Sequence, residues 1–312
     1  MALTQTTVQF AGADGTMLVG TLALATNQSP TSCVLMVHGG MGHRDYLYHK
    51  HITQEILAEH GGDVAVFRFD YNGNGDSDGD RFFMSSFHQD LDDIKVVISM
   101  LRAPPYQLQT VCIIGHSAGA QHALQFAVRS LREQEPDIVP PLMVCVQPRF
   151  RLQYWHEEWV RQTSQSGDGT WIMRWKTRGR QKEHSITLDD VKSYTSIDMD
   201  AIRNLNDPCF GDGRLQILTL HGVVATTKNS GANIMGYGAH DKATPDGVVP
   251  IVDCCAIANR INCDRHSMQL VSVTLISWHV ETEVVTVSRC HRLLEWITIS
   301  EKGVPRAGCG QF

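Results

Sequence analysis

Gly115-His116-Ser117-Ala118-Gly119 follows the apolar run 111–114 and precedes a segment of helical character, residues 121–131. A G-x-S-x-G pentapeptide between a strand and a helix is typical of a nucleophile elbow, a turn that holds its serine in a strained backbone conformation. The glycines are needed because a Cβ would collide with the strand or the helix at so sharp a bend. At a helix N-terminus the dipole also favours developing negative charge. We therefore interpret Ser117 as a nucleophile, the alternative being a purely structural turn.

Strand-like and helix-like segments alternate on both sides of this pentapeptide. Residues 8–22 predict a β-hairpin around an Asp-Gly turn. The apolar run 33–37 is typical of a strand in a parallel sheet that is covered on both faces. Further strands are predicted at 63–69, 111–114 and 141–146, with helices at 46–59 and 87–101, the second ended by Pro104-Pro105. This alternation predicts right-handed crossovers and an α/β fold with a doubly wound, mostly parallel sheet.

The alternation stops between residues 148 and 205 and resumes with a strand at 215–220. The interrupting segment contains four tryptophans among charged residues: Trp155, Trp159, Trp171 and Trp175. We interpret it as an inserted cap, because ligands of open α/β sheets bind beyond the carboxyl ends of the strands. The alternative is a surface excursion that its tryptophans anchor to the core. The predicted organisation is a core in two parts, 1–147 and 206–312, with a cap insertion at 148–205.

The composition excludes several other classes of protein. The chain has 312 residues, of which 42% are hydrophobic and 19% charged, as in ordinary globular proteins. A net charge of −6 without a basic stripe argues against nucleic-acid binding, and no apolar run approaches the roughly 18 residues that span a bilayer. The nine cysteines are scattered and lack C-x-x-C pairs, and residues 1–7 lack a signal-peptide pattern. We expect a cytoplasmic protein without a metal site; the sequence does not define its oligomeric state.

A second glycine-rich turn, His38-Gly39-Gly40-Met41-Gly42, directly follows the strand at 33–37. A serine nucleophile needs two N–H groups for the oxyanion. One comes from a strand-end turn upstream of the elbow, and the other from the residue after the nucleophile. We assign these roles to the backbone N–H groups of Gly40 and Ala118. The alternative is an ordinary glycine-rich turn at the end of a strand.

In their order along the chain, these motifs resemble those of α/β-hydrolases of the cinnamoyl/feruloyl-esterase-like group, within the wider serine aminopeptidase- and lysophospholipase-like superfamily. The matching segments cover most of the chain: His38–Gly40, Phe67–Asp70 with Gly73, Gly75 and Ser77, Gly115–Gly119, His221-Gly222, Asp246–Pro250 and Leu294–Ile297. The resemblance implies the α/β-hydrolase fold, a cap after the sixth strand, a serine–histidine–aspartate triad and no cofactor. It implies a small carboxylic ester as the substrate, cleaved through an acyl-enzyme.

Within this set, Asp70-Tyr71-Asn72-Gly73-Asn74-Gly75 imitates the start of an EF-hand calcium loop. The twelfth position of such a loop should be a bidentate glutamate, but Arg81 stands there, so we predict no calcium site. We expect Asp70 instead to brace a strand-to-helix loop by hydrogen bonds.

The resemblance places the acid of the triad shortly after a strand-ending His-Gly and before a Val-Pro. Here His221-Gly222 and Asp246–Pro250 look like two halves of that motif, separated by an atypical insert at 224–245. We assign the acid to Asp246 because an apolar-periodic segment of helical character follows it. Asp241 is the alternative.

The base is expected after the last strand, where the family has an Asp-His pair that this chain lacks. His279 follows a β-like run at 268–277, and we assign it as the base. It could instead match a second, non-catalytic histidine that some relatives carry. His291 and the absence of any functional base remain open alternatives.

The departures from the family pattern lie in the last third of the chain, at 224–245, 272–278 and 288–292. We hypothesise that they are retained intron or frame-shifted sequence; genuine loop elaboration and a decayed pseudoenzyme are the alternatives. Finding all three segments in the mature transcript would refute the first hypothesis.

Two other functions remain open. An aminopeptidase-like enzyme on the same scaffold would need an acidic group such as Glu157 or Glu158 to hold the substrate amine. A non-catalytic ligand-binding protein would bind small molecules without turnover.

Overall fold

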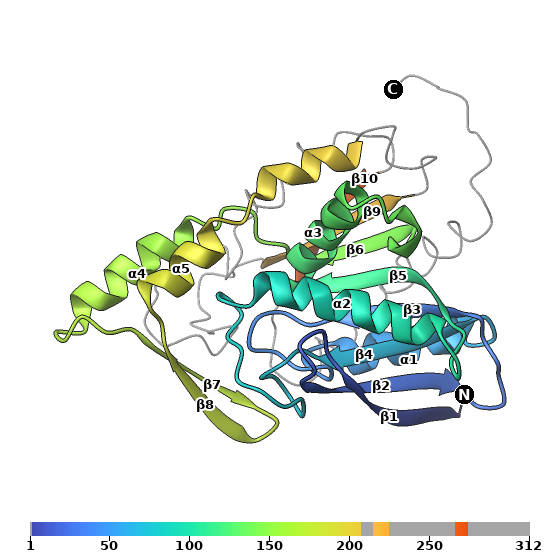
Figure 1. Ribbon diagram of the computed structural model, residues 1–312. Coiled ribbons are helices and arrows are strands. Elements are labelled where there is room, and N and C mark those ends of the chain that lie inside the picture. The colour runs from blue at the N-terminus through green and yellow to red at the C-terminus, as the bar shows by residue number, and fades with distance from the viewer. Residues whose placement is uncertain (1, 207–214, 225–265, 274–312) are drawn as a thin grey trace.

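The computed structural model of the protein describes residues 2–206, 215–224 and 266–273 (Figure 1). Its centre is an eight-stranded sheet with the order β1-β2-β4-β3-β5-β6-β9-β10. The strands are β1 Leu3–Ala11, β2 Met17–Ala25, β3 Ser32–Val37, β4 Val64–Asp70, β5 Gln109–His116, β6 Leu142–Val146, β9 Gln216–Val224 and β10 His266–Val273. β2 pairs antiparallel with β1 and β4, and every other pair in the sheet is parallel. The predicted hairpin and the predicted mostly parallel sheet are confirmed.

Helices cover the sheet on both faces. α2 (Phe87–Arg102) and α3 (Ala118–Arg132) lie on one face and α1 (His49–His60) on the other (Figure 1). Neighbouring residues of β3 alternate between the two cores, so Leu35 packs with α2 and α3 while Val34 packs with α1. This alternation explains why residues 33–37 of this central strand are all apolar. Within the described residues, no helix is long and apolar enough to cross a membrane.

The helix boundaries follow from local backbone rules. α2 ends at Arg102 and is followed by Ala103 with ψ 160°, because a residue before a proline avoids the helical region. The predicted end at Pro104-Pro105 is therefore confirmed. The sequence predicts that this helix starts at Tyr46, but α1 begins at His49. The reason is that Leu47 has a φ of 50°, which a right-handed helix does not accommodate.

Residues 148–205 contain a small set of elements between β6 and β9. They are α4 (Tyr154–Gln165), the antiparallel pair β7 (Ile172–Thr177) and β8 (Arg180–Ser185), α5 (Leu188–Thr195) and the start of a 3₁₀ helix (Met199–Asn206). In Figure 1, α4, α5 and the β7–β8 hairpin extend away from one end of the sheet. α5 begins directly after Thr187, which forms a reciprocal capping box with Asp190.

Candidate active site

Ser117 lies at the turn where β5 ends and α3 begins. Its backbone has φ 53° and ψ −117°, a conformation that is strained for a residue with a Cβ. The turn is fixed by a hydrogen bond from the Ser117 N–H to the carbonyl oxygen of Val146, at 2.9 Å. Ser117 is half-buried, whereas His116 and Ala118 on either side are buried. The structure thus gives the sharp strand-to-helix turn that the pentapeptide predicts, with the serine at its apex.

Gly115 and Gly119 allow this turn by close backbone approach. A Cβ on Gly115 would lie 2.4 Å from the carbonyl oxygen of Gly119. A Cβ on Gly119 would lie 2.5 Å from the carbonyl oxygen of Val37 and 2.6 Å from that of His38. Because these are backbone atoms of β3 and its following turn, no side-chain rotation would relieve the collisions. The start of α3 is therefore packed directly against the end of β3.

The same packing brings the His38–Gly42 turn beside Ser117. A Cβ on Gly39 would lie 3.1 Å from the Cβ of Ser117. The turn is closed by a hydrogen bond from the Gly42 N–H to the Gly39 oxygen, at 3.0 Å, with Met41 at φ 60°. Gly39 therefore lies directly beside Ser117, and Gly40 is the next residue of the same turn. Ala118 is the first residue of α3, where a backbone N–H has no partner within the helix. Their roles as oxyanion donors remain a prediction.

His38 braces this turn from inside the protein. Its Nε2 accepts a hydrogen bond from the Tyr71 N–H at 3.2 Å, and its Nδ1 lies 2.7 Å from the Gly39 oxygen. Because Nε2 accepts from a backbone N–H, the ring proton must be on Nδ1, from which it is donated to Gly39. Burial lowers the pKa of His38, so the ring stays neutral. His38 thereby joins the turn after β3 to the loop after β4.

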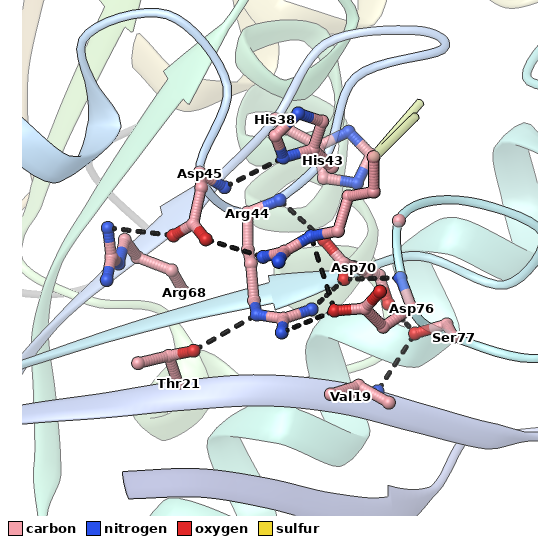
Figure 2. A network of polar contacts seen from close by, with 12 residues as sticks. Val19, Thr21, His38, His43, Arg44, Asp45, Arg68, Asp70, Asp76 and Ser77 are labelled. Atoms are coloured by element: carbon pink, nitrogen blue, oxygen red, sulfur yellow. Dashed lines mark hydrogen bonds and ion pairs between the residues drawn. The ribbon is translucent and has the colours of Figure 1, made fainter. Parts of the chain in front are cut away.

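Asp70 lies at the end of β4, and its carboxylate forms an ion pair with Arg44. Figure 2 shows the Arg44 guanidinium between Thr21 and the carboxylates of Asp70 and Asp76. Asp70 is fully buried and also accepts a hydrogen bond from the Asp76 N–H at 2.9 Å. The Ser77 hydroxyl donates to the Asp70 carbonyl oxygen at 2.6 Å. These hydrogen bonds from Asp76 and Ser77 confirm that Asp70 braces the loop after β4. Arg44 balances the charge of its carboxylate.

Phe83 is a site neighbour that the sequence analysis missed. A Cβ on Gly40 would lie 2.9 Å from its ring, so Phe83 forms a wall behind the glycine turn. The same ring contacts Trp155, with centroids 5.7 Å apart, and Tyr194, at 5.5 Å. Trp155 stacks on Trp171 at 6.2 Å. The run Phe82-Phe83-Met84, apolar within an otherwise polar loop, was the available signal.

The 148–205 segment is also tied to the helix that follows Ser117. The Tyr194 hydroxyl on α5 donates to Oε1 of Gln121 at 2.5 Å. The Gln121 amide nitrogen donates to the Arg149 carbonyl oxygen at 2.5 Å. Gln121 lies one turn after Ser117 on α3. These buried contacts fix the segment beside the nucleophile turn.

Two histidines near this site, His116 and His122, are buried in the core. His122 follows Gln121 on α3, is 2% exposed, and has its Nδ1 3.2 Å from the Tyr71 hydroxyl. Burial lowers the pKa of His122 to about 3 and that of His116 to about 4. Together with their burial, these pKa values fit neutral, structural rings. His38, His116 and His122 are all buried and do not reach the surface at which Ser117 is exposed, so none of them is suited to serve as its base.

The predicted acid and base lie outside the described residues. This applies to Asp246 and His279 and to their alternatives Asp241 and His291. What the structure does describe is the sheet edge that leads toward them. β9 carries the His221-Gly222 backbone and pairs in parallel with β6 and with β10, which overlaps the predicted strand at 268–277. The assignments of the acid and the base remain predictions.

Comparison with known families places this site in a class of hydrolases. The profile of the family described as serine aminopeptidase, S33 (Hydrolase_4) matches residues 28–233, which is more than half of the chain. The protein therefore belongs to this family. The match includes the His38 turn, the Asp70 loop and the Ser117 elbow. A search of curated proteins found no match to the sequence.

Solved structures with similar backbones have the α/β-hydrolase fold. The α/β-hydrolase GrgF from Penicillium sp. sh18 superposes with a TM-score of 0.59 at 14% identity, covering 94% of this chain and 98% of its own. The Pyrococcus furiosus esterase PF2001 gives 0.61 at 14% identity, covering 95% and 91%. Est1E from Butyrivibrio proteoclasticus with bound ferulic acid gives 0.60 at 18% identity, covering 93% and 99%. At these identities the likeness shows the fold, which is the one the sequence predicts.

Proposed function

We propose that the protein is a serine hydrolase that cleaves carboxylic esters through an acyl-enzyme on Ser117. The observation that carries the proposal is the strained, half-exposed backbone position of Ser117 at the N-terminus of α3, with Gly39 directly beside it. A serine in such a turn presents its hydroxyl outward and has backbone donors nearby, as acyl transfer requires. The family match supports the same chemistry.

The reaction would proceed in two halves. His279 accepts the proton of the Ser117 hydroxyl as Oγ attacks the ester carbonyl carbon, and Asp246 holds the imidazole in the required tautomer. The N–H groups of Gly40 and Ala118 stabilise the oxyanion of the tetrahedral intermediate. Collapse of this intermediate breaks the bond to the alcohol, which leaves with the proton from His279. Water then attacks the acyl-enzyme in the same way and releases the acid.

The acyl group is proposed to be an aryl-acrylate of the feruloyl or cinnamoyl type, with the 148–205 segment acting as a cap. Two observations support this class. Trp155 and Phe83 are in contact beside Gly40, so an aromatic acyl group would find apolar, aromatic surroundings. A structure with a similar fold, Est1E, holds ferulic acid. Three buried, reduced cysteines, Cys33, Cys112 and Cys145, support a cytoplasmic location for the enzyme.

The family description favours peptide substrates as the second candidate. Such an enzyme would need a carboxylate free to hold the substrate amine. Glu158 is already bound by Arg161 at 2.6 Å and by Gln162 at 2.7 Å, and Glu157 is exposed to solvent. Neither of the candidate glutamates is held ready for an amine, so we prefer the ester.

Fluorophosphonate labelling tests the proposal directly. The wild-type protein should be labelled and should hydrolyse p-nitrophenyl acetate and aryl-acrylate esters, and Ser117→Ala should lose both activities. An aminoacyl p-nitroanilide, compared at the same enzyme concentration, separates the ester from the peptide candidate. A folded wild-type protein that is neither labelled nor active would refute the enzyme and leave the non-catalytic binding protein.

A further inference from the structure

The tip of the β7–β8 hairpin holds an arginine in an unfavourable backbone conformation. Thr177 and Arg180 are paired across the hairpin, so Arg178 and Gly179 form a two-residue turn with φ 45° and 79°. Positive φ at both positions is typical of a type I′ turn, which strongly prefers Asn-Gly or Gly-Gly. A long charged side chain at the first position is unusual. Its conformation must therefore be held by the contacts of the side chain.

Arg178 contacts two carboxylates on two different loops of the core. Its guanidinium lies 2.5 Å from the carboxylate of Asp45 and 3.2 Å from that of Asp76. The Arg178 side chain is 27% exposed and that of Asp45 is 13% exposed, so the first pair is partly shielded from water. Asp45 follows the His38–Gly42 turn, whereas Asp76 lies in the loop after β4. One side chain of the hairpin thus joins both loops.

The loop that contains Asp45 directly follows the His38–Gly42 turn, whose Gly40 N–H is the proposed oxyanion donor. Arg44, the preceding residue, binds Asp70 and Asp76, and Figure 2 shows Asp45 facing the buried Arg68. Ion pairs with the core therefore hold this loop at two successive residues, Arg44 and Asp45, directly after the His38–Gly42 turn. A shift of Asp45 would be transmitted to the turn over a few residues of backbone.

A second, aromatic connection leads from the hairpin to the same turn. Trp175 on β7 and His184 on β8 both contact Phe82, with ring centroids 6.0 Å and 4.1 Å apart. Phe82 contacts Phe83 at 4.8 Å, and Phe83 is the wall behind Gly40. Both connections therefore begin on the hairpin and end at the glycine turn beside Ser117.

We propose that Arg178 is a positioning residue for the oxyanion turn: by bridging Asp45 and Asp76 it locks the hairpin onto the core and fixes the geometry at Gly40. The inference rests on the proposed function for its catalytic consequence. The locking of the hairpin itself is a physical property that can be measured without activity. Arg180 and Lys182 add bonds to the carbonyl oxygens of Gly75 and Gly73, but Arg178 alone of these three contacts the loop that carries the turn.

Hydrogen exchange of the full-length chain, compared between variants by mass spectrometry, tests the lock. In Arg178→Ala we expect exchange to rise about tenfold both in peptides covering 172–185 and in peptides covering 38–48. Arg178→Lys keeps the positive charge but not the guanidinium that bridges two carboxylates, so it should retain part of the protection that Arg178→Ala loses. Arg174→Ala is the matched control, because Arg174 lies on the same hairpin and pairs with the exposed Glu183. It should leave both regions unchanged.

The catalytic consequence is read from the rate of fluorophosphonate labelling and from ester turnover. Arg178→Ala should lower the labelling rate constant and kcat about fivefold while KM changes less, because the oxyanion acts in the transition state. Unchanged exchange in both regions would overturn the lock. Increased exchange in the hairpin alone, with unchanged labelling, would overturn the coupling to the turn. If the wild-type protein were not labelled at all, the proposed function would fail, and increased exchange at 38–48 would still support the lock.

Discussion

Ser117 at the elbow and Arg178 at the hairpin tip share an unfavourable feature, a left-handed φ at a residue with a Cβ, but different forces hold them there. Ser117 is held by backbone packing between β5, α3 and the end of β3, with Gly115 and Gly119 allowing the approach. Arg178 is held by its side-chain charge. Strain held by packing does not respond to salt, whereas strain held by partly exposed ion pairs does. The elbow therefore keeps its geometry under conditions that loosen the hairpin.

The largest expected difference in stability between the two regions comes from adding a methyl group to a glycine in each. Gly119→Ala should lower the free energy of unfolding by about 5 kcal/mol, because the Cβ would collide with two backbone carbonyl oxygens. Gly179→Ala should cost about 1 kcal/mol, because its φ of 79° is unfavourable but nothing lies within 4 Å of the new Cβ. Urea unfolding of the two variants measures both. Similar losses would contradict the contrast between the two regions.

Gly40→Ala tests the point where the two regions meet. The added Cβ would lie 2.9 Å from the Phe83 ring, so the turn must shift and displace its N–H group. We expect ester turnover to fall by a factor on the order of 10². The double variant with Phe83→Ala removes the collision and should recover part of the activity. Equal turnover in wild type and Gly40→Ala would show that the turn supplies no oxyanion donor.

Acid should lower the free energy of unfolding through His122, which lies on the helix that follows Ser117. Its pKa is about 3 in the folded protein, against an ordinary value of 6.5. Between pH 7 and pH 5 the unfolded chain binds a proton that the folded chain does not, so His122 lowers stability by about 2 kcal/mol. In His122→Gln the loss of stability over this interval should be smaller by that amount. Urea unfolding at both pH values checks it, and an unchanged pH dependence would contradict the assigned burial.

The smallest expected effect separates strain from charge at the hairpin tip. Arg178→Gly and Arg178→Ala both remove the ion pairs, but only glycine adopts a φ of 45° without strain. We expect Arg178→Gly to be more stable than Arg178→Ala by about 1 kcal/mol in urea unfolding. Both variants should show increased hydrogen exchange at 172–185 and 38–48, because both lack the ion pairs. Equal stability would mean that the backbone at this position is not strained.

The sequence predicted those parts of the molecule that depend on neighbouring residues. The strand at 33–37 and the Ser117 elbow follow from apolar runs and glycine spacing, which act over a few positions. The contact between Arg178 and Asp45 joins residues 133 positions apart, and their charges look like those of any solvated surface. The packing of Phe83 against Gly40 depends in the same way on how two loops meet. Asp246 and His279 lie outside the described residues and remain predictions.

The two ends of the 148–205 segment have a consequence for how proteins of this fold diversify. The Gln147 N–H donates to the Leu220 oxygen at 2.8 Å, and the Gln216 N–H donates to the Pro141 oxygen at 2.7 Å. The chain thus leaves the sheet and returns to it on two adjacent strands, so the sheet imposes no particular length on what lies between. Loop closure costs grow slowly with length, so this position tolerates exchange of one segment for another. Evolution can replace the surroundings of Ser117 here without rebuilding the turn that carries it.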